Sequence, residues 1–275
     1  MGATATEDVN GWPNNVKAPS ATPYNDVFPQ PTALTLEEIE DLKKKWVAGV
    51  ERAVKAGFDV IEIHNAHGYL FHEFLSPIAN QRTDKYGGSF ENRTRLTLEI
   101  VEFTRKAMPK DMPLFLRISA TDWLDTNPEF KGESWTLDDT LKLAPLLAER
   151  GVDFLDVSSG GNSPMQKIKA GPGYQAPFAK AIKKAVGEKM FVGTVGSITE
   201  GKQAEALLTG KGSEEQARGS EELDAVLVGR MFQKEPGLVW RFAEELGVQI
   251  NVANQIRWGF GGRPGAAKRE KSGKL

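Results

Sequence analysis

The sequence of 275 residues contains no cysteine, so disulfide bonds, thiolate catalysis and cysteine-ligated metals are excluded. Histidine is also scarce, with three residues, and we predict no metal site. No apolar run approaches the roughly 20 residues of a membrane helix, and the first residues lack the apolar core of a secretory signal. The formal net charge of −2 favours neither nucleic acid nor an anionic membrane as a partner. We therefore expect a cytoplasmic globular protein that binds neither.

What the sequence does contain is an alternation of short apolar runs with amphipathic segments. We expect a proline-rich extended segment at 1–34, a folded region at 35–260 and a basic, disordered tail at 261–275. The folded region alternates about five strands with about six helices, as in a parallel sheet covered by helices or closed into a barrel. A (β/α)₈ barrel has eight strands. The sequence therefore predicts either an open sheet or a barrel without its first three strands.

The boundaries of these elements follow from periodicity and turn residues. Thr35 and Glu38 have the spacing of a capping box at the start of the first helix, and Gly57 is placed to end it. Residues 64–93 are expected to form a long loop, a feature that is usually functional in compact domains. The expected strands are 59–63, 114–119, 154–158, 190–195 and 224–228, and the expected helices are 35–56, 92–107, 137–149, 177–186, 200–208 and 237–246.

The stretch FDVIEIHNAHGYL, residues 58–70, places polar side chains at the end of an apolar strand. In parallel barrels the catalytic side chains gather at the C-terminal ends of strands. His64 and His67 are a weak metal signal at this spacing. Their N–H groups either bind an oxyanion or polarise a carbonyl, or are satisfied by backbone groups. Tyr69 is placed to donate a proton, because a phenol is protonated at neutral pH.

Arg117 lies inside the apolar strand LFLRIS, where a charge is costly unless it is paired. It therefore either forms an ion pair with Glu62, in the neighbouring apolar run, or stands beside an electron-rich ligand. Both interpretations stay open on physical grounds alone.

The last two expected strands both end in glycine, at Gly196-Ser197 and at Gly229-Arg230. A single glycine in this position is explained well enough by chain reversal. Two glycines at successive strand ends, with an arginine, instead favour a phosphate site, because exposed backbone N–H groups and a guanidinium both bind anions.

Six stretches resemble the old yellow enzyme family of flavin-dependent ene-reductases. They occur in the family's order over about residues 20–260, and they are GFDVIEIHNAHGYLFHEFLSPIANQRTDKYGGSFENR, LFLRIS, FLDVSSGG, GYQAPFA, VGTVGSI and LVGRMFQKEP. The resemblance implies a TIM barrel that binds FMN and is reduced by NADPH or NADH. It also implies reduction of the activated C=C bond of α,β-unsaturated carbonyl compounds, with an enone or nitro compound as substrate.

The resemblance also implies roles for individual residues. His64 and His67 would hydrogen-bond the carbonyl or nitro oxygen of the substrate, and Tyr69 would protonate its α-carbon. Arg117 would stabilise negative charge at the N1/O2 edge of the reduced flavin. Four residues would hold the FMN phosphate: Gly196, Ser197, Gly229 and Arg230.

The chain departs from the family in lacking the first three strands, so its five strands correspond to the family's fourth to eighth. We therefore expect an incomplete barrel with unpaired edges at 59–63 and 224–228, and weakened FMN binding. Any homo-oligomer is expected to form through these edges or the C-terminal segment. Two alternatives stay open. One is a non-catalytic truncated barrel that acts as a binding or interaction protein. The other is a phosphate-binding barrel enzyme without redox chemistry, such as an aldolase, with Lys167 or Lys169 in a loop.

Overall fold

The computed structural model of the chain describes residues 4–211 and 221–261. These residues divide into two compact units. The first runs to Thr199 and resumes over Gln203–Val228, and the second comprises Glu200–Lys202 and the chain from Gly229 onward. No helix among the described residues is both long and apolar enough to cross a membrane. The tail expected at 261–275 lies, beyond Gly261, outside the described residues.

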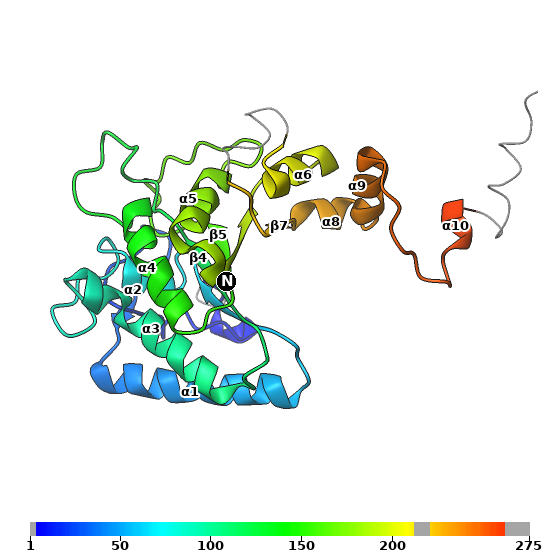
Figure 1. The fold of residues 1–275 in the computed structure, drawn as a ribbon. Helices are drawn as coiled ribbons and strands as arrows, with labels where there is room; N and C mark the ends of the chain where they lie inside the picture. The colour runs from blue at the N-terminus through cyan, green and yellow to red at the C-terminus, as the bar shows by residue number, and fades with distance from the viewer. Residues whose placement is uncertain (1–3, 212–220, 262–275) are drawn as a thin grey trace, which may run out of the picture. The chain divides into compact units, whose positions relative to one another are not determined.

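A five-stranded parallel sheet forms the centre of the first unit (Figure 1). Its strands lie in sequence order: β3 (Ile61–Asn65), β4 (Leu114–Ser119), β5 (Phe154–Ser158), β6 (Phe191–Val195) and β7 (Ala225–Leu227). The predicted α/β fold with a parallel sheet is thereby confirmed. Among the described strands the sheet is open, with β3 and β7 at its edges.

The main helices of the first unit lie side by side along one face of the sheet (Figure 1). In spatial order they are α1 (Leu36–Lys55), α3 (Phe90–Ala107), α4 (Leu137–Glu149) and α5 (Ala176–Val186). The short α2 (Leu70–Leu75) packs against α3. The remaining elements are η1 (Glu7–Val9), β1 (Lys17–Ala18), β2 (Thr32–Ala33), η2 (Gly187–Lys189), α6 (Gly201–Thr209), α8 (Arg230–Lys234), α9 (Leu238–Leu246) and α10 (Trp258–Gly261).

Strand pairing places alternate residues in rows across the sheet. One row faces the helices and is fully buried: Ile63, Leu116, Leu155 and Val192. The next residue of each strand forms a row on the opposite face: His64, Arg117, Asp156 and Gly193. Because side chains alternate along a strand, the same strands carry an apolar core on one side and polar chemistry on the other.

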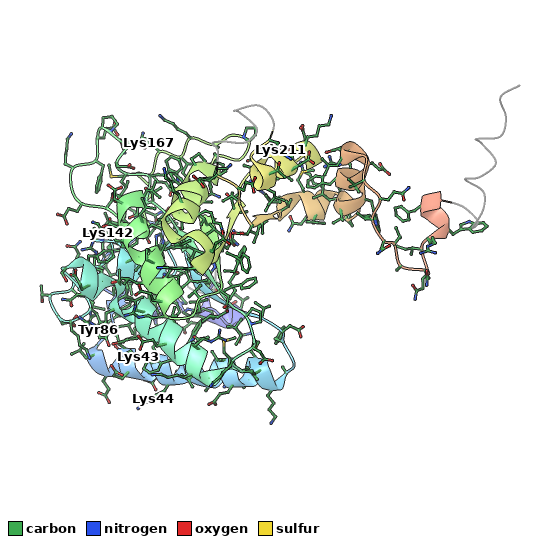
Figure 2. All side chains as sticks on the ribbon, in the orientation of Figure 1. Lys43, Lys44, Tyr86, Lys142, Lys167 and Lys211 are labelled. Carbon is green, nitrogen blue, oxygen red and sulfur yellow. The ribbon has the colours of Figure 1, made fainter. Side chains whose placement is uncertain are left out.

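Two local features fix α1 where the sequence predicts it. The capping box at its start is confirmed, because Glu38 N–H donates to Thr35 Oγ1 and Thr35 N–H donates to Glu38 Oε2. Further along, the buried ammonium of Lys43 lies 2.6 Å from Glu99 of α3 and donates to the Tyr86 hydroxyl at 2.7 Å (Figure 2). These bonds attach α1 to α3 and to the loop before α3.

The structure corrects two expectations near the proposed site. The first strand was expected at 59–63 but runs from Ile61 to Asn65, because its pairing with β4 starts only at Leu114. His64 therefore lies in the strand and not in the loop. The long loop expected at 64–93 contains α2 and the first turn of α3, which begins after Ser89, whose side chain accepts from the N–H of Asn92.

Candidate functional site

The three predicted catalytic side chains meet where β3 ends. The imidazole of His64 lies 5.3 Å from that of His67 and 5.2 Å from the Tyr69 ring, centroid to centroid. Between them the backbone turns sharply, with positive φ at His67 (61°) and Gly68 (72°). Tyr69 then occupies the N-cap position of α2 without a side-chain capping bond, and it is 60% exposed, so the residue is accessible to a ligand.

His67 is held by two serines from neighbouring strands. Its backbone N–H donates to Ser119 Oγ at 3.0 Å, and its Nε2 lies 2.6 Å from Ser158 Oγ. Ser158 Oγ also donates to Gln175 Oε1 at 3.3 Å. Burial, with a smaller effect of the positive charge of Arg117, lowers the pKa of His67 to about 4. The imidazole is therefore neutral at neutral pH, and one of its nitrogens is bonded to Ser158.

Arg117 follows His64 in the row that crosses the sheet, and the next residue of that row is Asp156. Arg117 Nε lies 3.0 Å from Asp156 Oδ2, so its ion-pair partner is Asp156 and not Glu62, the partner considered from the sequence. Burial raises the pKa of Asp156 to about 6, although Arg117 acts in the opposite direction. The approach lacks hydrogen-bond geometry, and Arg117 Nε and both carboxylate oxygens of Asp156 are buried without a hydrogen-bond partner.

The first half of the predicted phosphate site has the backbone of an anion-binding turn. Gly196 and Ser197 follow one another with φ of 120° and 52°, a conformation that can direct successive N–H groups to one side. A Cβ at position 196 would lie 2.8 Å from the Tyr174 ring and 2.9 Å from Gln175 Nε2, so only glycine fits there. The predicted partners Gly229 and Arg230 belong to the second unit, where Arg230 is exposed at the first position of α8. The union of both halves in one site stays a prediction.

Together these residues fit a flavin mononucleotide. The Arg117–Asp156 pair offers buried polar atoms that lack partners, as the polar edge of a flavin ring would require. The turn at Gly196 offers a place for a phosphate. Among the described residues, no group of three or more His, Cys, Asp or Glu side chains is arranged to hold a metal ion.

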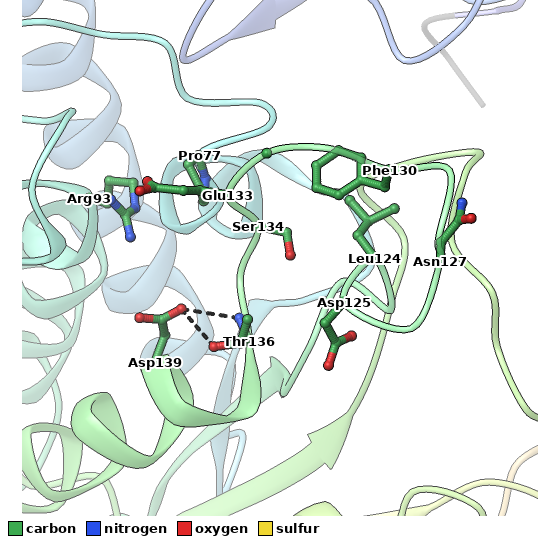
Figure 3. A pocket seen from close by; sticks show the side chains of 11 residues that line it. Pro77, Arg93, Leu124, Asp125, Asn127, Phe130, Glu133, Ser134, Thr136 and Asp139 are labelled. Atoms are coloured by element: carbon green, nitrogen blue, oxygen red, sulfur yellow. Dashed lines mark hydrogen bonds between the residues drawn. The ribbon is translucent and has the colours of Figure 1, made fainter.

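A separate pocket of about 520 Å³ lies beside the loop that joins β4 to α4 (Figure 3). Two of its charged groups serve local structure. Asp139 accepts from the N–H and hydroxyl of Thr136, and Arg93 donates to the backbone oxygens of Leu75 and Gly88. None of the predicted site residues lines this pocket, so it is not the predicted active site.

Sequence reasoning missed a buried group directly behind the β3 turn. The imidazole of His72 and the carboxyl group of Asp122 are fully buried, and Gly68 N–H donates to His72 Nδ1 at 3.0 Å. The signal that could have found it is His72 itself, a polar residue in the apolar stretch YLFHEFL. A histidine buried in such a stretch needs hydrogen-bond partners.

Comparison with known proteins identifies the family. A family model described as the NADH:flavin oxidoreductase / NADH oxidase family matches residues 3–249. The chain belongs to this family. The predicted resemblance is confirmed, and so are the predicted cofactors, since FMN and a reduced nicotinamide are those of the family.

Individual proteins similar to this chain support the same family assignment. An NADH:flavin oxidoreductase of Gibberella zeae is 51% identical over 269 residues, which cover 96% of this chain and 62% of the relative. An NADPH dehydrogenase of Geobacillus thermodenitrificans is 41% identical over 90% of this chain and 66% of its own length. The structure of morphinone reductase in complex with tetrahydroNAD superposes with a TM-score of 0.62 at 25% identity, covering 86% of this chain and 61% of that one. The chain thus spans somewhat less than two thirds of the length of these proteins.

Proposed function

We propose that the chain provides the substrate-binding side of an FMN-dependent oxidoreductase that reduces activated C=C bonds of α,β-unsaturated carbonyl compounds with NADPH or NADH. The observation that supports this most is the cluster of His64, His67 and Tyr69 at the end of β3, with Arg117 in register on the neighbouring strand. Two hydrogen-bonding rings, an exposed phenol and a cation at one strand end suit a substrate that must be polarised at oxygen and protonated at carbon.

When bound, FMN supplies hydride transfer from the nicotinamide to the substrate. The residues of this chain hold and tune it. The guanidinium of Arg117 stabilises negative charge on the ring, because Asp156 leaves it without a well-formed hydrogen bond. The N–H groups at Gly196 and Ser197 receive the phosphate, and the contribution expected from Gly229 and Arg230 stays a prediction.

The histidines bind the oxygen of the enone or nitro substrate. The hydroxyl of Ser158 has one proton, which it gives either to Gln175 Oε1 or to His67 Nε2. In the second arrangement the ring proton of His67 is on Nδ1 and is available to the substrate. Burial and the charge of Arg117 lower the pKa of His64, which also favours a neutral donor. Tyr69 then delivers the proton to the α-carbon of the substrate.

The Tyr69→Phe variant tests this assignment. We expect reoxidation of the reduced flavin by cyclohexenone to slow by about 10² or more, because the proton donor is lost, while reduction of the flavin by NADPH stays near the wild-type rate. Stopped-flow absorbance of the FMN-loaded protein measures both half-reactions. Tyr24→Phe, in the N-terminal segment, is the matched control and should change neither rate.

Two outcomes would count against the proposal. Loss of both half-reactions in Tyr69→Phe would assign the tyrosine a structural role. Wild-type protein that is loaded with FMN but transfers no hydride to cyclohexenone would remove the ene-reductase function. The cytoplasmic location and an oligomer formed through sheet edges stay predictions.

A further inference from the structure

The β3 turn rests on a buried polar cluster that the proposed chemistry does not use. His72 comes from α2, Asp122 from the loop after β4 and Asn162 from the loop after β5. The side chains of His72 and Asp122 are 0% exposed, and Asn162 is 9% exposed. Buried polar groups of this kind are costly unless their bonds are satisfied. We therefore ask which hydrogen bonds these three side chains make and which part of the backbone they hold.

The bonds of His72 define its tautomer. A backbone amide can only donate, so Gly68 N–H, 3.0 Å from Nδ1, requires a lone pair there and places the ring proton on Nε2. Nε2 lies 3.2 Å from Asn162 Nδ2 and 3.5 Å from Asp122 Oδ1. The amide of Asn162 lies between the two and donates to Asp122 Oδ1 at 3.1 Å. Because an Nε2–H and an amide N–H are both donors, the acceptor that the Nε2–H can face is the carboxyl group of Asp122 and not the amide nitrogen of Asn162. The imidazole is thus an acceptor toward the turn, with its ring proton directed at the acid.

Asp122 is itself rigidly held. Its Oδ2 accepts from the hydroxyl of Ser76, at the end of α2, and from the backbone N–H of Trp135 at 2.9 Å. The cluster therefore connects α2 and two strand-end loops to a single backbone N–H in the β3 turn.

The turn has no space to move away from this contact. A Cβ on Gly68 would lie 2.2 Å from the carbonyl oxygen of Gly161, and a Cβ on Gly161 would lie 2.2 Å from the carbonyl carbon of His67. The two backbones touch on one side while His72 holds Gly68 on the other. The orientation of the peptide between His67 and Gly68, and with it that of both flanking side chains, is thereby fixed.

We propose that His72 is a positioning residue: by accepting the Gly68 N–H on Nδ1 while Nε2–H faces Asp122, it sets the orientation in which the β3 turn presents His67 and Tyr69. The catalytic consequence rests on the function proposed above. The positioning itself is a property of this chain and is measurable without flavin or substrate.

The chain is well suited to a direct test, because its three histidines, His64, His67 and His72, all belong to this region. Long-range ¹H–¹⁵N correlation spectra of the ¹⁵N-labelled protein report the tautomer of each imidazole. We expect the Nε2–H form for His72 and a coupling across the hydrogen bond between the Gly68 amide nitrogen and His72 Nδ1. The Nδ1–H form, or a Gly68 amide with no such coupling, would overturn the proposal. This arm uses wild-type protein and needs no variant to fold.

Three variants separate positioning from general packing. His72→Leu removes the acceptor, His72→Asn keeps a carbonyl oxygen near the position of Nδ1, and Phe74→Leu disturbs the fully buried side of the same helix without touching the hydrogen bond. We expect His72→Leu to shift the Gly68 amide and His67 imidazole resonances, His72→Asn to restore most of the wild-type spectrum, and Phe74→Leu to leave both in place. If Phe74→Leu shifts them as much as His72→Leu does, the role is packing and the proposal fails.

The kinetic arm uses FMN-loaded protein. We expect His72→Leu to slow flavin reoxidation by cyclohexenone by about tenfold to 100-fold, because a small displacement of aligned groups is costly. Flavin reduction by NADPH should change much less, and His72→Asn should recover most of the rate. Wild-type protein that does not reduce cyclohexenone would end the proposed function but leave the spectroscopic result standing. Shifted resonances combined with an unchanged reoxidation rate would overturn the claim that the orientation matters for catalysis.

Discussion

The two faces of the sheet use the same strands for opposite purposes. Toward the helices, Ile63, Leu116 and Leu155 are fully buried in one hydrophobic core. One residue further along the same strands, Arg117 and Asp156 place charges on the other face, with buried atoms that lack hydrogen-bond partners. Residues that stabilise the fold and residues that carry the proposed chemistry are thus direct neighbours along each strand. A register shift of one residue would turn the apolar row away from the helices and the polar row toward them.

The largest effect should come from the helix-facing side. Leu116→Ala removes a fully buried side chain and leaves a cavity, so we expect the free energy of unfolding to fall by about 2 to 5 kcal/mol. Its neighbour Phe115 is half-buried on the other face, where its ring is tilted by 36° against that of Phe154 with ring centroids 4.7 Å apart. Phe115→Ala removes a side chain that is only half-buried, so its loss should be smaller than that of Leu116→Ala, with the contact between the two rings contributing about 1 kcal/mol of it. Urea unfolding of both variants measures the contrast, and equal losses would show that the faces are energetically alike.

A smaller effect concerns the charge on the opposite face. Burial raises the pKa of Asp156 to about 6, above its unfolded value near 4. The native state therefore holds this proton more tightly. Its contribution to stability is fully present below the unfolded pKa and is lost as the pH rises through about 6, a change of roughly 2 to 3 kcal/mol.

Asp156→Asn isolates that contribution. The stability of the wild type minus that of the variant should fall between about pH 4 and pH 6.5 and then level off. Unfolding by urea across this range measures it, with other titrating groups cancelling in the difference. A difference curve that rises with pH would show instead that Arg117 stabilises the carboxylate more than burial disfavours it.

The smallest expected effect concerns the protonation state of His67, which should not change between pH 8 and 5.5. Because the pKa of His67 is lowered to about 4, its imidazole should stay neutral from pH 8 to 5.5, whereas an exposed histidine titrates near 6.5. Imidazole resonances of His67 should stay flat over this range. Ser158→Ala, which removes the hydroxyl bonded to Nε2, is the informative comparison. A wild-type inflection near pH 6.5 would place His67 in a solvated environment and weaken its role as a neutral donor.

Much of the fold is predictable because its signals are local. The strands Leu114–Ser119 and Phe154–Ser158 and the helix Leu137–Glu149 agree with expectation to the residue. β3 does not, because Phe58 and Val60 belong to the same apolar run but are 65% and 37% exposed, outside the stretch that pairs with β4. Apolarity alone cannot show where a partner strand begins.

In the candidate site, too, the features that depend on local sequence were predictable and those that depend on distant loops were not. The proximity of His64, His67 and Tyr69 follows from short spacing at one strand end and was predicted. The bond from His67 to Ser158 and that from Gly68 to His72 were not, because they depend on how separate loops approach one another. The Arg117 partner was missed for a related reason, since strand order and register decide that Asp156 lies beside it.

The backbone contact between Gly68 and Gly161 has a consequence for how this protein can change over generations. A single methyl group at either position would meet main-chain atoms at 2.2 Å, so neither loop tolerates a larger residue without displacing the other. The two loops must be inherited as a matched pair.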